Sequence, residues 1–182
     1  GTITAWYLSR LAISTITATA SEAAGKAQLA TKDLHAGLGL AGLITSLGVE
    51  RIAQAGLPFA SVAADNDAYA ACTGAFGGGD GGIVIAGTGS IGFALVGGAR
   101  QMVGGWGFAL GDHGSGAWIG HHAVRRAALS IDGLLQPTAM IEKILESVGR
   151  TRFDLSRWSQ QATPKDYGQF APLVFASAAE GD

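Results

Sequence analysis

Two glycine-rich segments carry polar side chains at spacings that suit phosphate and sugar chemistry. The first is Gly87-Thr88-Gly89-Ser90-Ile91-Gly92, and it follows Ile83–Ala86, an apolar stretch typical of a buried strand. Consecutive backbone N–H groups in such a loop form a concave anion site, and the hydroxyls of Thr88 and Ser90 add donors. The loop therefore predicts a phosphate site, while a plain glycine hairpin explains the same residues.

The same loop matches the G-x-G-x-x-G pattern of dinucleotide-binding folds, and Asp112 lies 20 residues after Gly92. That interpretation requires a helix directly after the glycines. Instead, Phe93–Val96 is apolar and ends at Gly97-Gly98, which is typical of a strand. We therefore expect a strand–loop–strand with the glycines at its tip, and we take the dinucleotide match as accidental.

The second segment runs from Gly104 to Gly116 and contains six glycines, Trp106 and the carboxylate of Asp112. Asp112 precedes an expected helix over 116–129, so it can act as a helix cap worth about 1 kcal/mol. A capping carboxylate in a glycine-lined turn is also placed to hold a sugar hydroxyl or a hydrated Mg²⁺. The two roles are compatible, and both stay open from the residues alone.

A third acidic group, Asp65-Asn66-Asp67, ends an expected strand over 59–64 and opens a helix that runs to Phe76. Ligands of open α/β sheets bind outside the carboxyl ends of strands. A carboxylate at that place can take a proton from an attacking hydroxyl, although the residues alone favour helix capping as its role. Three histidines, His113, His121 and His122, do not share one helix face, so we expect no metal site.

The remaining pattern predicts an α/β protein with two parts. Strands over 3–8, 35–42 and 59–64 alternate with helices over 21–30, 45–55 and 67–76. Strands over 83–86, 91–96 and 101–103 follow, with connections so short that they are expected to be antiparallel.

Helices over 116–129 and 137–148 come next, the second with Pro137 in its first turn and one apolar stripe. Thr163 opens a last helix, which Pro172 is expected to kink. The glycine tract 77–82 is the boundary between domains 1–78 and 79–182.

Composition excludes several classes of protein. The 182 residues are 48% hydrophobic and 14% charged with net charge −2, and no basic run provides a footprint for nucleic acid. No apolar run approaches the ~18 residues of a membrane span. The single cysteine, Cys72, cannot form an internal disulfide, which predicts a reducing cytoplasm. Low charge also predicts a homodimer, with the 137–148 stripe or the last helix as contact surface.

Three segments, NDAYAACTGA, IVIAGTGSIG and GGWGFALGDHGSGAWIG, occur in an order and spacing that resemble one family closely. It is the N-acetylglucosamine kinase and glucosamine kinase group of the BadF/BadG/BcrA/BcrD ATPase family. The resemblance covers residues 36–182 and includes GLGLAGL and APLVFASAAEGD. It implies a two-lobed actin-like ATPase fold of the ribonuclease H-like kind. It also implies phosphorylation of the 6-hydroxyl of an amino sugar, with ATP and Mg²⁺ as cofactors.

The resemblance also implies a role for particular residues. Asp67 matches the catalytic base that deprotonates the sugar hydroxyl. The residues that match ATP phosphate loops are Gly87, Thr88, Gly89 and Ser90, together with Thr2 and Thr4 in the tail of a first phosphate loop. Gly105 and Trp106 match the sugar-pocket turn, and Asp112 matches a sugar-binding aspartate.

The sequence departs from the family pattern at several places. His113 stands where the family has glutamate, no aspartate precedes Thr2, and the late adenosine-binding segment is absent after Asp182. We therefore expect an incomplete or gapped chain that is not an active kinase by itself. The choice between N-acetylglucosamine, glucosamine and another sugar stays open.

Two alternative functions stay open as well. One is the activator ATPase of the same family, whose cysteines hold an iron–sulfur cluster; a lone Cys72 argues against it. The other is a non-catalytic sugar- or ATP-binding module, against which the presence of Asp67 argues.

Overall fold

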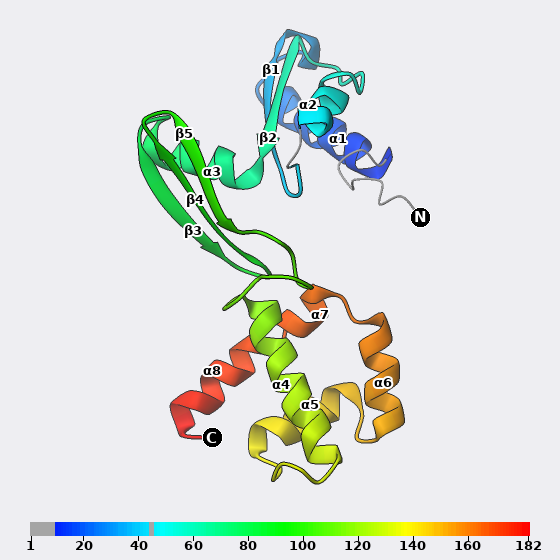
Figure 1. Ribbon diagram of the computed structural model, residues 1–182. Coiled ribbons are helices and arrows are strands. Elements are labelled where there is room, and N and C mark those ends of the chain that lie inside the picture. Colours follow the sequence, from blue (N-terminus) through cyan, green and yellow to red (C-terminus); the bar gives the residue numbers. More distant parts are fainter. Residues whose placement is uncertain (1–9, 44–45) are drawn as a thin grey trace. The chain divides into compact units, whose positions relative to one another are not determined.

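The computed structural model describes residues 10–43 and 46–182, and the chain divides into two compact units. Unit 1 consists of the residues up to Ile83 together with Phe93–Gln101. Unit 2 consists of Val84–Gly92 together with Met102–Asp182. The elements of both are labelled in Figure 1. The mixed α/β class predicted from the sequence is confirmed, whereas the domain limits 1–78 and 79–182 stay a prediction.

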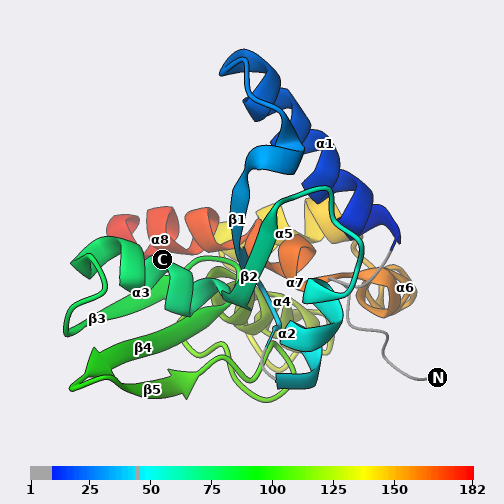
Figure 2. The same ribbon diagram turned by 90° about the horizontal axis from the view of Figure 1, so that it is seen from above.

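Unit 1 is built around two parallel strands, β1 (His35–Leu40) and β2 (Ser61–Asn66), whose register runs from the pair His35–Ser61 to the pair Leu40–Asn66. Three helices accompany them: α1 (Arg10–Lys26), α2 (Ser46–Ala53) and α3 (Asp67–Phe76), with a 3₁₀ turn at Thr31–Asp33. Figure 2 shows β1 and β2 side by side, with α3 continuing directly from the end of β2. The small core centres on Leu43 and Ile52, which contact Leu38, Leu40, Val49, Val62 and Ala64.

The strand and helix predictions for residues 35–76 are confirmed to within a few residues, but the first helix was placed wrongly. It begins at Arg10 instead of residue 21 and ends at Lys26. Its first half is rich in threonine and isoleucine, which have weak helix propensity. Ala12 and Ala24 are buried, and this packing outweighs that local preference. The strand expected over 3–8, with Thr2 and Thr4, lies outside the described residues.

A three-stranded sheet has the order β3 (Gly81–Ala86), β4 (Ser90–Val96) and β5 (Ala99–Gly104). Its neighbouring strands are joined by three and two residues, and such short connections allow only antiparallel pairing. Gly97 and Gly98 form the tighter turn with φ of +56° and +79°, which glycine adopts without strain. The glycines at 87–92 therefore lead into a strand, and the dinucleotide-binding interpretation is excluded as expected.

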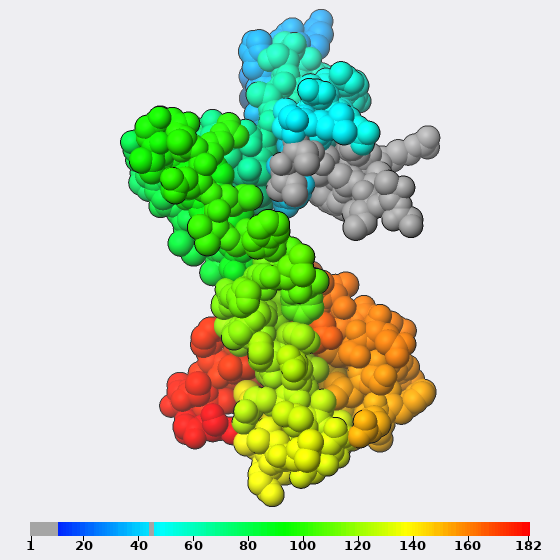
Figure 3. Space-filling model, in the orientation of Figure 1, coloured from blue at the N-terminus to red at the C-terminus, as the bar shows by residue number. Residues whose placement is uncertain are grey.

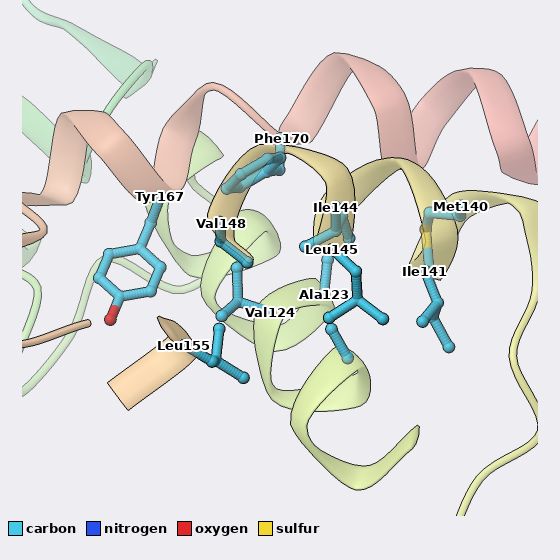
Figure 4. Packing of buried hydrophobic residues seen from close by; sticks show 11 residues of the cluster. Ala123, Val124, Met140, Ile141, Ile144, Leu145, Val148, Leu155, Tyr167 and Phe170 are labelled. Carbon is cyan, nitrogen blue, oxygen red and sulfur yellow. The ribbon is translucent and has the colours of Figure 1, made fainter. Parts of the chain in front are cut away.

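Unit 2 is mainly helical, with α4 (Gly116–Ile131), α5 (Ala139–Val148), α6 (Arg152–Gln161), α7 (Pro164–Gly168) and α8 (Ala171–Glu180). The apolar stripe of α5 forms the centre of its core, as Figure 4 shows. The buried members of this stripe are Met140, Ile141, Ile144, Leu145 and Val148. Because these side chains are already buried inside unit 2, the suggestion that the stripe is a dimer contact surface is wrong.

The helix ends of unit 2 correct two predictions about proline. Thr138 caps α5 by accepting the N–H of Ile141, so Pro137 precedes the cap and does not lie in the first turn. Pro172 lies in the first turn of α8, a position that tolerates proline, and it kinks no helix. Thr163 opens a helix as expected, and the structure shows that it forms a capping box with Asp166. Helix α6, capped by Thr151, was not predicted.

Two glycines of α4 allow other backbone segments to approach closely. A Cβ at Gly120 would lie well inside contact distance of the Tyr167 carbonyl oxygen, so α7 crosses α4 at this point. A Cβ at Gly116 would lie 3.2 Å from the carbonyl oxygen of Gly87. Within the described parts of the chain, no helix combines the length and apolar content needed to cross a membrane.

Candidate active site

The Gly87–Ser90 loop is fixed to the first turn of α4. The N–H of Gly116 donates to the carbonyl of Gly87 at 2.8 Å, and the N–H of Ala117 donates to the carbonyl of Thr88 at 3.2 Å. The next N–H, that of Trp118, donates to Ser115 Oγ at 3.1 Å. The donors at a helix N-terminus are often open to an anion. Here they are occupied, so α4 holds the loop in place and is not itself the anion site.

Ser90 connects three segments of unit 2. Its N–H donates to Asp112 Oδ1 at 3.1 Å, its Oγ donates to the carbonyl of His113 at 2.9 Å, and its carbonyl accepts the N–H of Gly105 at 3.1 Å. Both donors of Ser90 are therefore used inside the protein. A direct contact from Ser90 to a phosphate stays a prediction, and the contacts seen here make Ser90 an organiser of the loop.

The tip of the loop keeps its donors open. In residues 10–43 and 46–182 no acceptor takes the N–H groups of Thr88 and Gly89 or the hydroxyl of Thr88, and Thr88 is exposed. Two adjacent free amides with a hydroxyl beside them form the kind of backbone nest that binds anions. This part of the sequence prediction gains a structural basis, because the loop is held by α4 and Ser90 while its tip stays available.

Asp112 is buried, with 9% of its surface exposed, and its φ of +56° places it in the left-handed region. A Cβ at Gly89 would lie 2.9 Å from Asp112 Oδ1, so the glycine lets this carboxylate lie close to the loop. The cap of α4 is Ser115, which is 1% exposed, so the explanation of Asp112 as a helix cap is wrong. Among the residues described, no donor reaches the second carboxylate oxygen, Oδ2.

The turn after β5 lies against the same loop. Gly104 and Gly105 have φ of +77° and +71°, and a Cβ at Gly105 would lie 2.8 Å from the side chain of Ile91. Trp106 follows with 74% of its surface exposed, so its ring is free to cover a ligand. The ring of His113 is exposed and lies 6.2 Å from that of Trp118. Unit 2 thus gathers the loop, the turn and Asp112.

Asp67 belongs to unit 1, where it is the first residue of α3 and is exposed. The cap of α3 is Asn66, whose Oδ1 accepts the N–H of Tyr69 at 2.6 Å, so the capping explanation of Asp67 is wrong as well. Among the residues that the structure describes, the one donor to Asp67 Oδ1 is the neighbouring N–H of Ala68, at 3.0 Å. A Cβ at Gly39 would lie 2.7 Å from the Cβ of Ala70, so this glycine lets α3 lie close to β1.

The adjacent carboxylate, Asp65, is already engaged. Arg100 Nη1 donates to Asp65 Oδ2 at 2.8 Å, and the guanidinium lies 3.7 Å from the centre of the Tyr69 ring. Partial burial lowers the pKa of Arg100, but the hydrogen bond and the charge of Asp65 outweigh it and raise the pKa above its usual value. Sequence reasoning missed Arg100. It is the only charged residue between Asp80 and Asp112, which was the available signal.

The family of the chain follows from comparison with known proteins. The model of the BadF/BadG/BcrA/BcrD ATPase family matches residues 8–182. The chain belongs to this family. Its match to the family confirms the resemblance seen in the glycine-rich segments, and the family's actin-like ATPase fold accounts for the α/β elements of both units.

Two curated relatives of this chain are named as amino-sugar kinases. Glucosamine kinase GspK of Vibrio cholerae is 40% identical over 149 residues, which cover 82% of this chain and 51% of the relative. N-acetyl-D-glucosamine kinase of Dictyostelium discoideum is 36% identical over 106 residues, 55% of this chain and 33% of the relative. The chain thus spans about half or less of the length of these relatives.

Solved structures give the same fold. A candidate N-acetylglucosamine kinase of Chromobacterium violaceum superposes with a TM-score of 0.85 at 32% identity, over 93% of this chain and 61% of that one. A Porphyromonas gingivalis structure superposes with a TM-score of 0.64 at 20% identity over 91% of this chain and 58% of that one, a likeness of fold alone.

Proposed function

We propose that this chain is part of an ATP-dependent kinase that phosphorylates the 6-hydroxyl of glucosamine or N-acetylglucosamine. The observation that carries the proposal is the Gly87–Ser90 loop, which α4 holds by hydrogen bonds while the amide N–H groups of Thr88 and Gly89 stay open. The names of the relatives support the choice of an amino sugar as acceptor. Family membership supports ATP as the donor.

In this proposal the two aspartates have different tasks. Asp67 accepts the proton of the sugar hydroxyl as that oxygen attacks the γ-phosphate, because its carboxylate is exposed and, within residues 10–43 and 46–182, accepts just the Ala68 N–H. Asp112 binds a sugar hydroxyl through Oδ2 while Oδ1 stays on Ser90. Gly105 and Trp106 contribute the turn that covers the sugar. Phosphoryl transfer depends mainly on such positioning and on charge neutralisation.

Mg²⁺ is proposed to accompany ATP, where it neutralises charge on the phosphates. Among the described residues there is no group of three or more His, Cys, Asp and Glu side chains that could hold a metal ion. Magnesium in such enzymes is usually held by one or two carboxylates together with substrate phosphates and water. Because Oδ2 of Asp112 is assigned to the sugar, Mg²⁺ is proposed to be held mainly by the ATP phosphates and water.

The alternative functions differ from the kinase in ways that can be measured. Cys72 is buried, with its Sγ 3.5 Å from the carbonyl of Gly81, so it is poorly placed to ligate a cluster shared with another subunit. An activator ATPase would release ADP without sugar, and a non-catalytic module would release none. The proposal also includes a homodimer whose contact surface would include α8. It further includes two lobes joined near residues 77–82 and a cytoplasmic location.

The test is a coupled ADP-release assay of the full-length protein over a panel of glucosamine, N-acetylglucosamine, glucose and N-acetylmannosamine. The proposal expects ADP release that depends on one of the two amino sugars, and a product whose phosphorus is coupled to the protons at carbon 6. Equal ADP release with and without sugar, or no turnover with any sugar, would contradict it.

A further inference from the structure

A cavity of about 320 Å³ lies within unit 2, lined by α4, α6 and α7. None of its lining residues belongs to the Gly87–Ser90 loop, to the Gly105–Trp106 turn or to the Asp112 segment. Its apolar walls include Val124, Ala128 and Leu155. Figure 3 shows one face of unit 2, on which the α6 segment (orange) lies beside the α4 segment (yellow-green). The volume is at the lower end of the range for small-molecule sites.

The cavity carries one uncompensated positive charge. Arg152 on its rim is ion-paired with Asp132, which also lines it, so these two charges cancel. Arg125 is exposed at the rim, and no carboxylate in residues 10–43 and 46–182 pairs with it. Burial, and then the charges of Arg125 and His122, lower the pKa of His121, so this lining imidazole is neutral at neutral pH. Arg125 therefore remains as the charge available to a ligand.

Two hydroxyl groups add donors without partners. The Tyr167 ring is held by stacking on Phe108 at 5.3 Å and by the edge of Trp158 at 4.9 Å. Figure 4 places the Tyr167 ring beside Leu155, with its hydroxyl at the edge of the core cluster. Within the described part of the chain, no group bonds to that hydroxyl. Ser156 Oγ accepts the side-chain amide of Gln160 at 3.3 Å, which leaves its own proton free to donate.

We propose that this cavity binds a small organic monocarboxylate with a compact aromatic or branched apolar body. The apolar walls take the body of the ligand, and the guanidinium of Arg125 with the free hydroxyl protons takes the carboxylate. A phosphate dianion fits less well, because Arg125 supplies one positive charge against its two negative charges, while the Arg152–Asp132 pair contributes no net charge. Charge and shape therefore select a monoanion.

The test measures binding of phenylacetate to the full-length protein by calorimetry and ligand-observed NMR. Phenylacetamide, a neutral probe of the same shape, and benzyl phosphate, a dianion with the same ring, are measured beside it. Saturable binding of phenylacetate is expected, with the other two probes weaker by about tenfold or more, the loss typical of a charge-assisted hydrogen bond. Absence of saturable phenylacetate binding at millimolar concentrations, or tighter binding of benzyl phosphate, overturns the proposal.

Two variants locate the site. Arg125→Gln is expected to weaken phenylacetate binding about tenfold or more, and Ala128→Leu, which fills the cavity, to abolish it. Arg126→Gln is the matched control, because Arg126 is the next residue of α4 and does not line the cavity. Thermal melting confirms that each variant is folded. Equal affinity of the Arg125→Gln and Arg126→Gln proteins for phenylacetate would show that the carboxylate binds elsewhere.

Discussion

Asp67 in unit 1 and Asp112 in unit 2 have similar sequence settings but opposite surroundings. Each lies at or just before the start of a helix and was open to explanation as its cap. The structure assigns the caps to Asn66 and Ser115 instead. Asp67 is exposed, and in the described part of the chain its carboxylate accepts just the next N–H. Asp112 is buried, has a left-handed backbone and accepts the N–H of Ser90. The position of an acidic residue near the start of a helix therefore did not determine the role of its side chain.

The difference has a chemical consequence. A general base must exchange a proton with solvent and substrate, which favours an exposed carboxylate with few fixed partners. A carboxylate that orients a ligand gains from burial and a fixed hydrogen bond, because its geometry is then set before the ligand arrives. Asp67 fits the first description and Asp112 the second, and the following predictions test that assignment.

The largest effect is expected for Asp67→Asn. Asn66 still caps α3, so the fold should persist, while loss of a general base should lower kcat by about 10²–10⁴-fold. Steady-state kinetics of the full-length enzyme measure this. Asp65→Asn is the control, because it removes the ion pair with Arg100 and not the proposed base, so its kcat should stay near that of the wild type. Normal turnover of Asp67→Asn would contradict the assignment.

Gly120→Ala should destabilise unit 2 by about 3 kcal/mol, the upper end for overpacking, because the added Cβ meets the backbone carbonyl of Tyr167. Gly74→Ala in α3 of unit 1 is the opposite case. No atom lies within 4 Å of a Cβ there, so this change should stabilise by about 0.5–1 kcal/mol. Denaturant unfolding measures the unfolding free energy of both variants, which should fall for Gly120→Ala and rise for Gly74→Ala. Equal stability of both would show that α4 and α7 do not approach as described.

Asp112→Asn should raise the KM for sugar about tenfold or more, with a smaller change in kcat, because a charge-assisted contact to the sugar is lost. Asparagine tolerates the left-handed backbone at this position, whose φ is +56°, so the loop should keep its shape. Asp112→Ala serves for comparison, since it adds backbone strain and leaves Ser90 N–H without an acceptor. If the asparagine variant changes only thermal stability, Asp112 has a structural role alone.

Arg100→Gln should destabilise unit 1 by at most about 1 kcal/mol, because the Arg100 side chain is 49% exposed and water weakens its pairing with Asp65. The contact of its guanidinium with Tyr69 adds to the loss. The difference in unfolding free energy between the wild type and the variant should shrink at high salt, since exposed charge pairs are screened. A salt-independent difference would indicate that packing, and not charge, is what Arg100 contributes.

The smallest effect concerns His121 and pH. Burial, with the charges of Arg125 and His122, lowers its folded pKa below the usual histidine value of 6.5. The unfolded state therefore binds the proton more readily, so this contribution to stability is complete above pH 6.5 and is lost as pH falls through the folded pKa. Unfolding free energies between pH 5 and 8 should show a shallower acid-side fall for His121→Phe. An identical pH dependence of both proteins would exclude His121 as its source.

The local patterns of the sequence predicted much of the fold. The stripe of α5, the helix start at Thr163 and the strand–loop–strand around Gly87–Ser90 each depend on neighbours within a few residues, and each is confirmed. Helix α6 was missed because its sequence, RFDLSRWSQQ, buries a single residue, Leu155, and shows no clear apolar face.

The functional residues were identified by type, but their partners were not. Asp, Asn and Ser cap helices about equally well, so local sequence cannot choose between Asn66 and Asp67 or between Asp112 and Ser115. The choice depends on contacts between distant segments, such as Ser90 with Asp112 and Arg100 with Asp65. Contacts between residues so far apart in the sequence depend on how the strands come together, and no short-range pattern encodes them.

Equilibrium binding of the amino sugar to the Asp67→Asn and Asp112→Asn proteins tests the central claim most directly. The account predicts that Asp67→Asn binds sugar with the wild-type Kd and yet transfers phosphate slowly in a single turnover, whereas Asp112→Asn binds it about tenfold or more weakly. If Asp67→Asn instead loses as much sugar affinity as Asp112→Asn, or transfers phosphate at the wild-type rate, the proposed division between a base and a ligand-orienting carboxylate is wrong.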